Sequence, residues 1–217
     1  MKDCPIQRGS MLLTLVDPHA GFEAAYNRWY ERDHFYAGCM VGPWLFAGSR
    51  WVATRSLKDL RLSDGRGEVA DPVDAGSYVA IYWVLEGRDA DHWKWAGEQV
   101  HWLYANGRGF AERSHVHTVL FDYLTTRYRD ADPVPTQLAL DHGYPGIAMI
   151  ATDRAAGSRR PSRSTAAAPI SRARMRIVMP NICVRLMHRD LGARTADAFV
   201  ASGRSRGCGR RPAFNAA

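Results

Sequence analysis

Apolar and polar positions divide residues 10–130 into six segments, four with a strand pattern and two with a helix pattern. The strand segments are short, rich in β-branched and aromatic residues, and bounded by turn residues. The helix segments repeat apolar residues at steps of three and four, and Gly38, Gly42 and Pro43 are expected to break the first helix. The predicted elements are a strand at 10–17, a helix at 21–34, strands at 44–55 and 77–85, a helix at 90–106 and a strand at 114–128. The polar segment 56–76 is rich in Asp, Gly and Arg, which predicts a mobile loop.

The order β-α-β-β-α-β predicts an α+β fold, the ferredoxin-like split βαβ sandwich with both helices on one face of a four-stranded antiparallel sheet. The other face also carries large apolar side chains and would be an exposed apolar patch if nothing covered it. We expect a second copy of the same sheet to cover that face and complete a barrel. The sequence therefore predicts a homodimer through the sheet face.

A second unit of this kind begins after the first one. The segment Ile147–Gly157 matches Met11–Gly21, because each has six mostly apolar residues, an Asp, three further residues and a Gly. The match is short, so coincidence remains the alternative. It predicts that 131–153 holds a linker and the first strand of an incomplete second unit.

Charge divides the chain at the same place. The formal net charge is +7, but residues 154–217 hold 14 Arg and only two acidic residues, a charge of +12, which leaves −5 for the preceding part. All seven Trp and all nine Tyr precede residue 153. The segment 154–217 consists largely of Arg, Ala, Ser, Gly and Pro, which predicts a disordered basic tail. Met175–Phe199 is the one stretch of it with enough apolar residues for a short helix.

Three explanations of the tail stay open. We favour out-of-frame translation of a GC-rich gene, because the tail begins where the second unit breaks off. A solvated extension is the second explanation. A nucleic-acid-binding arm is the third, and we disfavour it because the tail lacks the aromatic residues that stack on bases and contains no known binding module.

Several classes of protein are excluded by what the sequence lacks. No apolar run approaches the roughly 20 residues of a membrane helix, and the N-terminus lacks the apolar run of a signal peptide. The four cysteines are too widely and irregularly spaced for a zinc motif or a disulfide framework. We therefore expect a cytoplasmic protein with reduced thiols, no membrane partner and no cofactor.

The segment Asn27–His34 resembles the N-x-W-Y-x-x-x-H pattern of the dimeric α+β barrel superfamily, and is most similar to its EthD-like members. The resemblance covers about Ser10–Arg129, a little over half of the chain. It implies a small-molecule pocket between sheet and helices or inside the barrel. The superfamily contains isomerases, monooxygenases, cyclases and haem-handling enzymes, so the resemblance does not identify a reaction.

The predicted catalytic residues are His34, Tyr30 and Asp33. His34 matches the histidine of the pattern, and an imidazole that titrates near neutral pH can shuttle a proton at a carbon next to a carbonyl. Tyr30 lies four residues earlier and shares a helix face with His34. Tyr30 and Asp33 are expected to tune or orient the imidazole. The alternative is a structural histidine at the helix end.

Five residues are predicted to contact a ligand. Aromatic side chains on strands and on the first helix form flat apolar walls, although they also simply fill cores. Arg50 and Arg55 flank Trp51 and are able to hold a carboxylate as a fork. The ligand-contacting set is Trp29, Trp51, Trp83, Arg50 and His117.

His115 and His117 alternate on the last strand, which predicts that both point to one side. Two such histidines suit a metal, but no third ligand or metal motif accompanies them, so we predict no metal site. Polar residues at a barrel mouth are the simpler interpretation. The sequence thus favours binding, and an isomerase-, cyclase- or monooxygenase-like reaction, of a small aromatic or polyketide-like compound. It leaves open whether the protein is an enzyme, and the main alternative is a non-catalytic, dimerising interaction protein.

Overall fold

The computed structural model describes residues 4–64, 69–131, 134–152, 174–179 and 182–188. Its strands form one antiparallel sheet in the order β2-β3-β1-β4-β7-β6-β5. The strands are β1 (Arg8–Pro18), β2 (Leu45–Val52), β3 (Tyr78–Leu85), β4 (Arg113–Tyr128), β5 (Ala148–Thr152), β6 (Arg174–Val178) and β7 (Ile182–His188). The helices are α1 (Glu23–Trp29), η1 (Tyr30–Met40), α2 (Arg55–Lys58), α3 (Asp89–Ala105) and α4 (Thr136–Asp141). The predicted α+β class is confirmed, and every element predicted before residue 130 has a counterpart.

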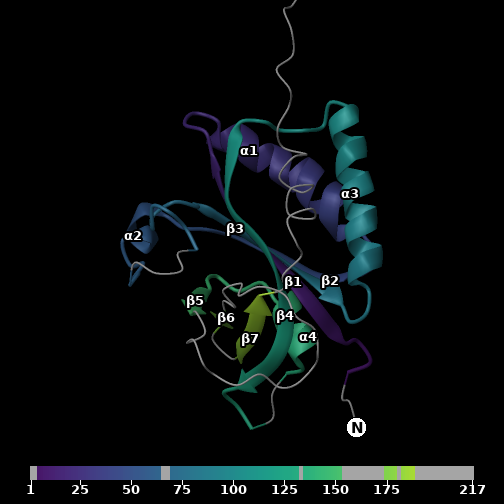
Figure 1. Cartoon of the computed structure of the whole chain (residues 1–217), viewed down its shortest axis with the longest axis vertical. Helices are drawn as coiled ribbons and strands as arrows, with labels where there is room; N and C mark the ends of the chain where they lie inside the picture. The colour runs from purple at the N-terminus through teal and green to yellow at the C-terminus, as the bar shows by residue number, and fades with distance from the viewer. Residues whose placement is uncertain (1–3, 65–68, 132–133, 153–173, 180–181, 189–217) are drawn as a thin grey trace, which may run out of the picture.

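Helices α1, η1 and α3 cover one face of the strands β1 to β4 (Figure 1). The core on this side, which we call the helix-side core, is built mainly from aromatic residues of α1, η1 and β3. Its largest fully buried side chains include Tyr26 and Tyr82. Each strand sends alternate residues to this side, since side chains alternate across a sheet.

The other face of the sheet is covered by residues of the same chain. Its apolar residues, among them Leu13, Trp83 and Phe121, pack with Leu140 of α4 and Ile177 of β6. We call this the far-side core. The expectation that a second copy of the sheet covers this face is corrected, because the chain supplies its own cover from α4, β5 and β6.

The basic tail contributes two strands, which corrects the helix expected within Met175–Phe199. Alternating residues explain the difference, because Met175 and Ile177 are buried while Arg176 between them is exposed. This period of two is a strand pattern rather than a helix pattern. Disorder was expected for the tail 154–217, of which residues 154–173, 180–181 and 189–217 lie outside the described residues.

A strand is present at β5, where the second unit was expected to begin. However, β5 pairs only with β6 in the described part of the chain, whereas β1, its counterpart in the matched segment, pairs on both sides. β5 therefore does not occupy the central position that β1 holds.

The first helix extends beyond Gly38, where the sequence predicted its end, and continues as the π-helix η1 to Met40. Gly38 is buried, and a Cβ atom at this position would lie 3.4 Å from a terminal methyl of Leu103 on α3. Its missing side chain thus serves close packing between η1 and α3 rather than a helix stop.

The segment after β2, for which composition predicts a mobile loop, contains the short helix α2 and hydrogen bonds that join its described residues to one another and to β1. The Arg61 guanidinium donates hydrogen bonds to the carbonyls of Val73, Ala75 and Gly76. The Asp17 carboxylate accepts hydrogen bonds from the backbone N–H groups of Gly76 and Ser77 at 2.6 and 2.7 Å. Polar side chains here satisfy backbone groups, which composition alone does not reveal.

Truncation of Ile177, which is 1% exposed, tests whether β6 completes the far-side core. We expect Ile177→Ala to lower the free energy of unfolding by about 2–5 kcal/mol, because it removes buried methyl groups and leaves a cavity. Ile150→Ala on the neighbouring strand is the matched control, since Ile150 is 47% exposed, and should change stability by less than about 0.5 kcal/mol. Urea denaturation measures both, and equal effects would show that β6 does not cover the sheet.

Candidate functional site

The sheet separates the predicted ligand-contacting residues into two groups. Trp29 and Arg50 lie on the helix side, together with Tyr30 and His34. Trp83 is 3% exposed within the far-side core, and Trp51 packs against that core while its indole N–H donates to the carbonyl of Tyr144 at 3.2 Å. Trp51 and Trp83 therefore do not share a site with His34.

The fork expected from Arg50 and Arg55 is not formed. The Arg55 guanidinium lies 2.9 Å from Asp59 and 3.2 Å from Asp74 in exposed ion pairs on the surface. Arg50 instead enters the helix side of the sheet. The two arginines therefore act separately.

A bulge in β4 corrects the prediction that His115 and His117 point to one side. His117 pairs with Leu15 of the far-side core, whereas His115 pairs with the next residue of β1, Val16 of the helix-side core. Directly paired residues of neighbouring strands share a face, so one extra residue on β4, Val116, moves His115 to the opposite face from His117. The bulge thus brings His115 to the helix side and leaves His117 away from it.

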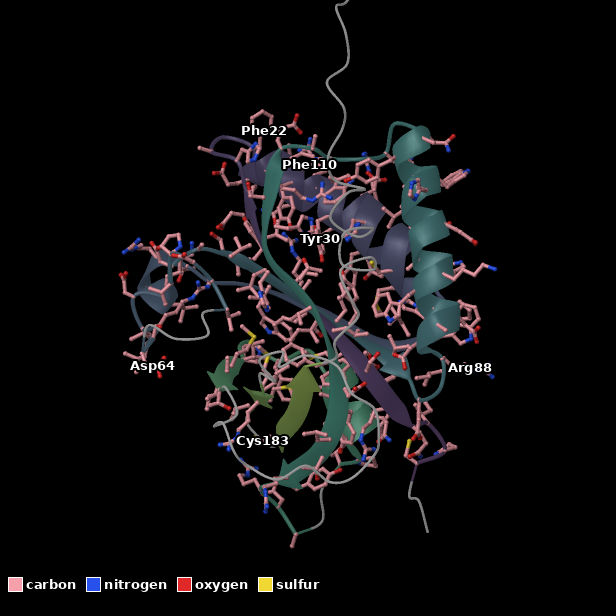
Figure 2. The ribbon with its side chains drawn as sticks, viewed as in Figure 1. Phe22, Tyr30, Asp64, Arg88, Phe110 and Cys183 are labelled. Carbon is pink, nitrogen blue, oxygen red and sulfur yellow. The ribbon has the colours of Figure 1, made fainter. Side chains whose placement is uncertain are left out.

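His34 lies at the centre of the helix-side group. Its imidazole stacks on Trp29 with ring centroids 4.9 Å apart and lies 5.0 Å from the ring of Tyr30. Its Nε2 atom is 3.9 Å from the Cys39 thiol. Figure 2 shows Tyr30 and Phe110 near α1, and Cys183 away from them at β7.

The π-helix explains the contact between His34 and Cys39. Hydrogen bonds in a π-helix span five residues, so side chains five positions apart lie one above the other. Such helices are rare and are frequent at functional sites. The contact between Tyr30 and Phe35, with ring centroids 6.3 Å apart, follows the same spacing.

A buried polar chain lies beneath the imidazole. The hydroxyls of Tyr30 and Tyr82 are 2.5 Å apart and share a hydrogen bond, and the Tyr82 hydroxyl also bonds Cys39. Burial raises the pKa of both tyrosines above their usual value and the pKa of Cys39 to about 12. All three groups are therefore protonated at neutral pH, and the Cys39 thiol is unsuited to act as a nucleophile.

Burial lowers the pKa of His34 to about 3, and the positive charges of Arg113 and Arg50 act in the same direction. The imidazole is consequently neutral at physiological pH, although part of the residue stays exposed. A neutral imidazole has one nitrogen with a proton and one able to accept a proton. An imidazole with so low a pKa is a weak base, which corrects the expectation that His34 titrates near neutral pH. His34 therefore takes up a proton readily only when a bound ligand raises its pKa.

Arg50 is held among three tyrosine rings. Its guanidinium carbon lies 4.3 Å from the centroid of Tyr30, 4.8 Å from that of Tyr78 and 5.3 Å from that of Tyr26. It donates to the Asn27 side chain at 2.5 Å. Cation–π contacts of this kind stabilise a desolvated arginine.

Asp33 is 1% exposed and accepts hydrogen bonds from Arg32 and Arg108. Burial works to raise the pKa of this carboxyl, but the bonds from the two arginines prevail and hold it below its usual value. The hydrogen bond from Arg108 joins η1 to the segment that follows α3, so Asp33 fastens this segment to the helix. The expected pairing of Asp33 with the imidazole is not among its hydrogen bonds within the described residues.

Sequence reasoning missed Arg113, His115, Tyr104 and Cys39 as neighbours of this site. Arg113 lies with its guanidinium carbon 4.7 Å from the Trp29 ring centroid and donates to the Tyr104 hydroxyl at 2.7 Å. Its Nε–H also donates to Nε2 of His115 at 3.2 Å. The only sequence signal for Arg113 was a charged residue at the start of a predicted strand. The bulge in β4 could not be read from the sequence, so the face of the sheet on which His115 lies could not be predicted.

Other chemistry is sparse in the described part of the chain. No three or more His, Cys, Asp and Glu side chains gather there in a way that would hold a metal ion. No helix there is long and apolar enough to cross a membrane. The proposed nucleic-acid arm falls mainly on residues outside the described ranges. No protein-family model, curated protein or solved structure gives a significant match to the chain.

Histidines with lowered pKa values make stability depend on pH. Burial lowers the pKa of His34 to about 3 and those of His92 and His115 to about 4, below the 6.5 expected in the unfolded chain. The unfolded state then binds more protons below pH 6.5, so the free energy of unfolding should fall as pH drops from 7 toward 4.

In the variant His34→Gln, the free energy of unfolding should fall less steeply as pH drops, with a slope smaller by up to the contribution of one proton. The double variant His34→Gln/His92→Gln should give a smaller slope still. Urea titrations at a series of pH values measure the slopes. A slope for His34→Gln equal to that of the unaltered protein would contradict the neutral, enclosed imidazole.

Asp33→Asn tests the fastening role of Asp33. We expect it to lower the free energy of unfolding by about 1–3 kcal/mol, because charge-assisted hydrogen bonds to a buried carboxylate are lost. Asp91→Asn, in an ion pair of which both partners are more than half exposed, is the control and should have little effect. Thermal unfolding followed by circular dichroism compares the two, and similar losses would refute this role.

Proposed function

We propose that the protein binds a small aromatic or polyketide-like molecule on the helix side of its sheet and that His34 transfers a proton on that molecule. The observation that carries the proposal is the neutral imidazole of His34, stacked on Trp29 and half enclosed by aromatic residues. Flat aromatic walls with a few polar groups are typical of sites for flat apolar ligands. Trp29, which is 6% exposed and also stacks on Phe110, forms the inner wall behind the imidazole, and Tyr30 sets the position of the imidazole from below.

The reaction class that fits is an isomerisation at a carbon next to a carbonyl group. His34 accepts the proton from that carbon, which leaves an enolate, and then returns the proton to another carbon of the same molecule. Atoms and charge balance without an oxidant or reductant. General base catalysis of this kind contributes typically 10²–10⁴-fold to the rate.

The arrangement of the first four strands supports a fold of the dimeric α+β barrel type. The order β2-β3-β1-β4, with every neighbouring pair antiparallel and the two main helical segments on one face, is that of a ferredoxin-like unit. We include this unit, with its resemblance to EthD-like proteins, in the proposal. The far face departs from the type, because it is covered from within the chain.

A non-catalytic interaction protein is less well supported. That reading depended on a bare sheet face for dimerisation, and α4 and β6 occupy this face. It also gives no reason for an imidazole to be held neutral among aromatic rings. The outcome of the next experiment separates the two functions.

The experiment measures hydrogen–deuterium exchange at the carbon next to the carbonyl of a panel of aryl ketones, followed by NMR. We expect the protein to accelerate exchange for at least one ketone and His34→Gln to lose about 10²- to 10⁴-fold of the acceleration. His101→Gln, an exposed histidine on α3, is the matched control and should retain it. Equal rates for the protein and His34→Gln, with both folded by circular dichroism, would favour the non-catalytic function.

A further inference from the structure

Among the described residues, the guanidinium of Arg113 has no anionic partner. Its guanidinium contacts are the Trp29 ring, the Tyr104 hydroxyl and Nε2 of His115, none of which carries a negative charge. His115 is itself neutral, because burial lowers its pKa to about 4 and the charge of Arg113 acts in the same direction. Arg50, by contrast, has the carboxylate of Glu31 at 3.6 Å.

One nitrogen of the Arg113 guanidinium, Nη1, also has no hydrogen-bond partner within the described residues. The Nε–H and one Nη2–H are engaged, whereas Nη1 is buried. A buried donor without a partner costs free energy, and the cost is larger when the group is charged. A ligand that brings a negative oxygen to Nη1 relieves this cost.

The place of Arg113 links it to the proton-transfer group. Its guanidinium lies over the Trp29 ring, and the same ring stacks on the imidazole of His34. Trp29 is 6% exposed and also stacks on Phe110 with ring centroids 5.4 Å apart, so a flat ligand contacts this ring only where it displaces a side chain that covers it. A molecule with an anionic group at Nη1 that takes such a place beside Trp29 extends toward His34.

We propose that Arg113 binds the carboxylate of an aromatic carboxylate ligand and thereby determines the substrate class of the site. This inference rests on the proposed function, since it concerns the same ligand. Because Nη1 is enclosed, the ligand reaches it only if the neighbouring side chains move. A charge-assisted hydrogen bond between guanidinium and carboxylate is among the strongest in proteins.

The bound carboxylate also affects His34. The positive charge of Arg113 contributes to the low pKa of the imidazole, so an anion beside Arg113 offsets that contribution and raises the pKa of His34. The imidazole then becomes a better base when the ligand is present. Binding and activation are coupled in this way through one guanidinium group.

The test uses two probes of the same shape, 2-naphthoate and its uncharged analogue 2-naphthamide, in calorimetric titrations of the full chain. We expect the protein to bind 2-naphthoate more tightly than 2-naphthamide. Arg113→Gln should weaken 2-naphthoate binding about 10- to 100-fold and leave 2-naphthamide binding unchanged. Arg88→Gln, at an exposed arginine directly before α3, is the matched control and should affect neither probe.

Arg113→Lys retains the charge and guards against loss of folding in Arg113→Gln. It should remain folded by circular dichroism and bind 2-naphthoate with an affinity between those of the unaltered protein and Arg113→Gln. Absence of 2-naphthoate binding by the unaltered protein, equal affinities for the two probes, or an unchanged affinity in both Arg113 variants would overturn the proposal.

His34→Gln separates this inference from the proposed function. We expect it to bind 2-naphthoate while it loses exchange of the aryl ketones. If binding depends on Arg113 but exchange does not depend on His34, the carboxylate site stands and the proton-transfer function fails. If exchange depends on His34 but 2-naphthoate does not bind, the function stands and the carboxylate site fails.

Discussion

Strand β1 is buried on both faces, and the rest of the structure follows from this constraint. Every residue from Ser10 to Val16 is at most 8% exposed. A strand of this kind needs a neighbour on each edge and a layer on each face. β3 and β4 supply the edges, and α1, η1 and α3 supply one layer. The second layer comes from α4, β5 and β6 of the same chain, so the far face is closed without a partner.

The candidate site depends on two local irregularities next to this regular sheet. The π-helix η1 brings His34 over Cys39, and the β4 bulge brings His115 to the same side of the sheet. Arg113, two residues before His115, then lies over Trp29. A regular α-helix and a regular strand would have placed these side chains elsewhere. Irregular backbone of both kinds is often found near functional sites.

The sequence was informative where regular patterns govern the structure and uninformative where they break. The periodicities at 10–128 predicted the order of strands and helices, and the four-residue spacing of Tyr30 and His34 predicted their contact. The bulge at Val116 could not be predicted, because it changes the face of His115 without any Gly or Pro signal. Gly38 was interpreted as a helix stop, since its packing against Leu103 depends on tertiary contact.

Tertiary contact also decided the role of the charged and aromatic residues. By residue type alone, Trp51 and Trp83 are as good candidates for a ligand contact as Trp29. Side chains alternate between the two faces of a strand, and the positions of Trp51 and Trp83 direct them to the far-side core. The arginine-rich composition of the tail concealed the alternation around Arg176, where two buried apolar residues flank an exposed charge. Composition is averaged over a segment, whereas burial is decided residue by residue.

The central claim is that ligands bind on the helix side of the sheet, against Trp29. The indole N–H signals of the seven tryptophans test it directly in a two-dimensional ¹H–¹⁵N NMR titration with 2-naphthoate. The account predicts that the Trp29 signal shifts with saturation while the signals of Trp51 and Trp83, across the sheet, remain in place. Shifts of Trp51 and Trp83 without a shift of Trp29 would contradict it.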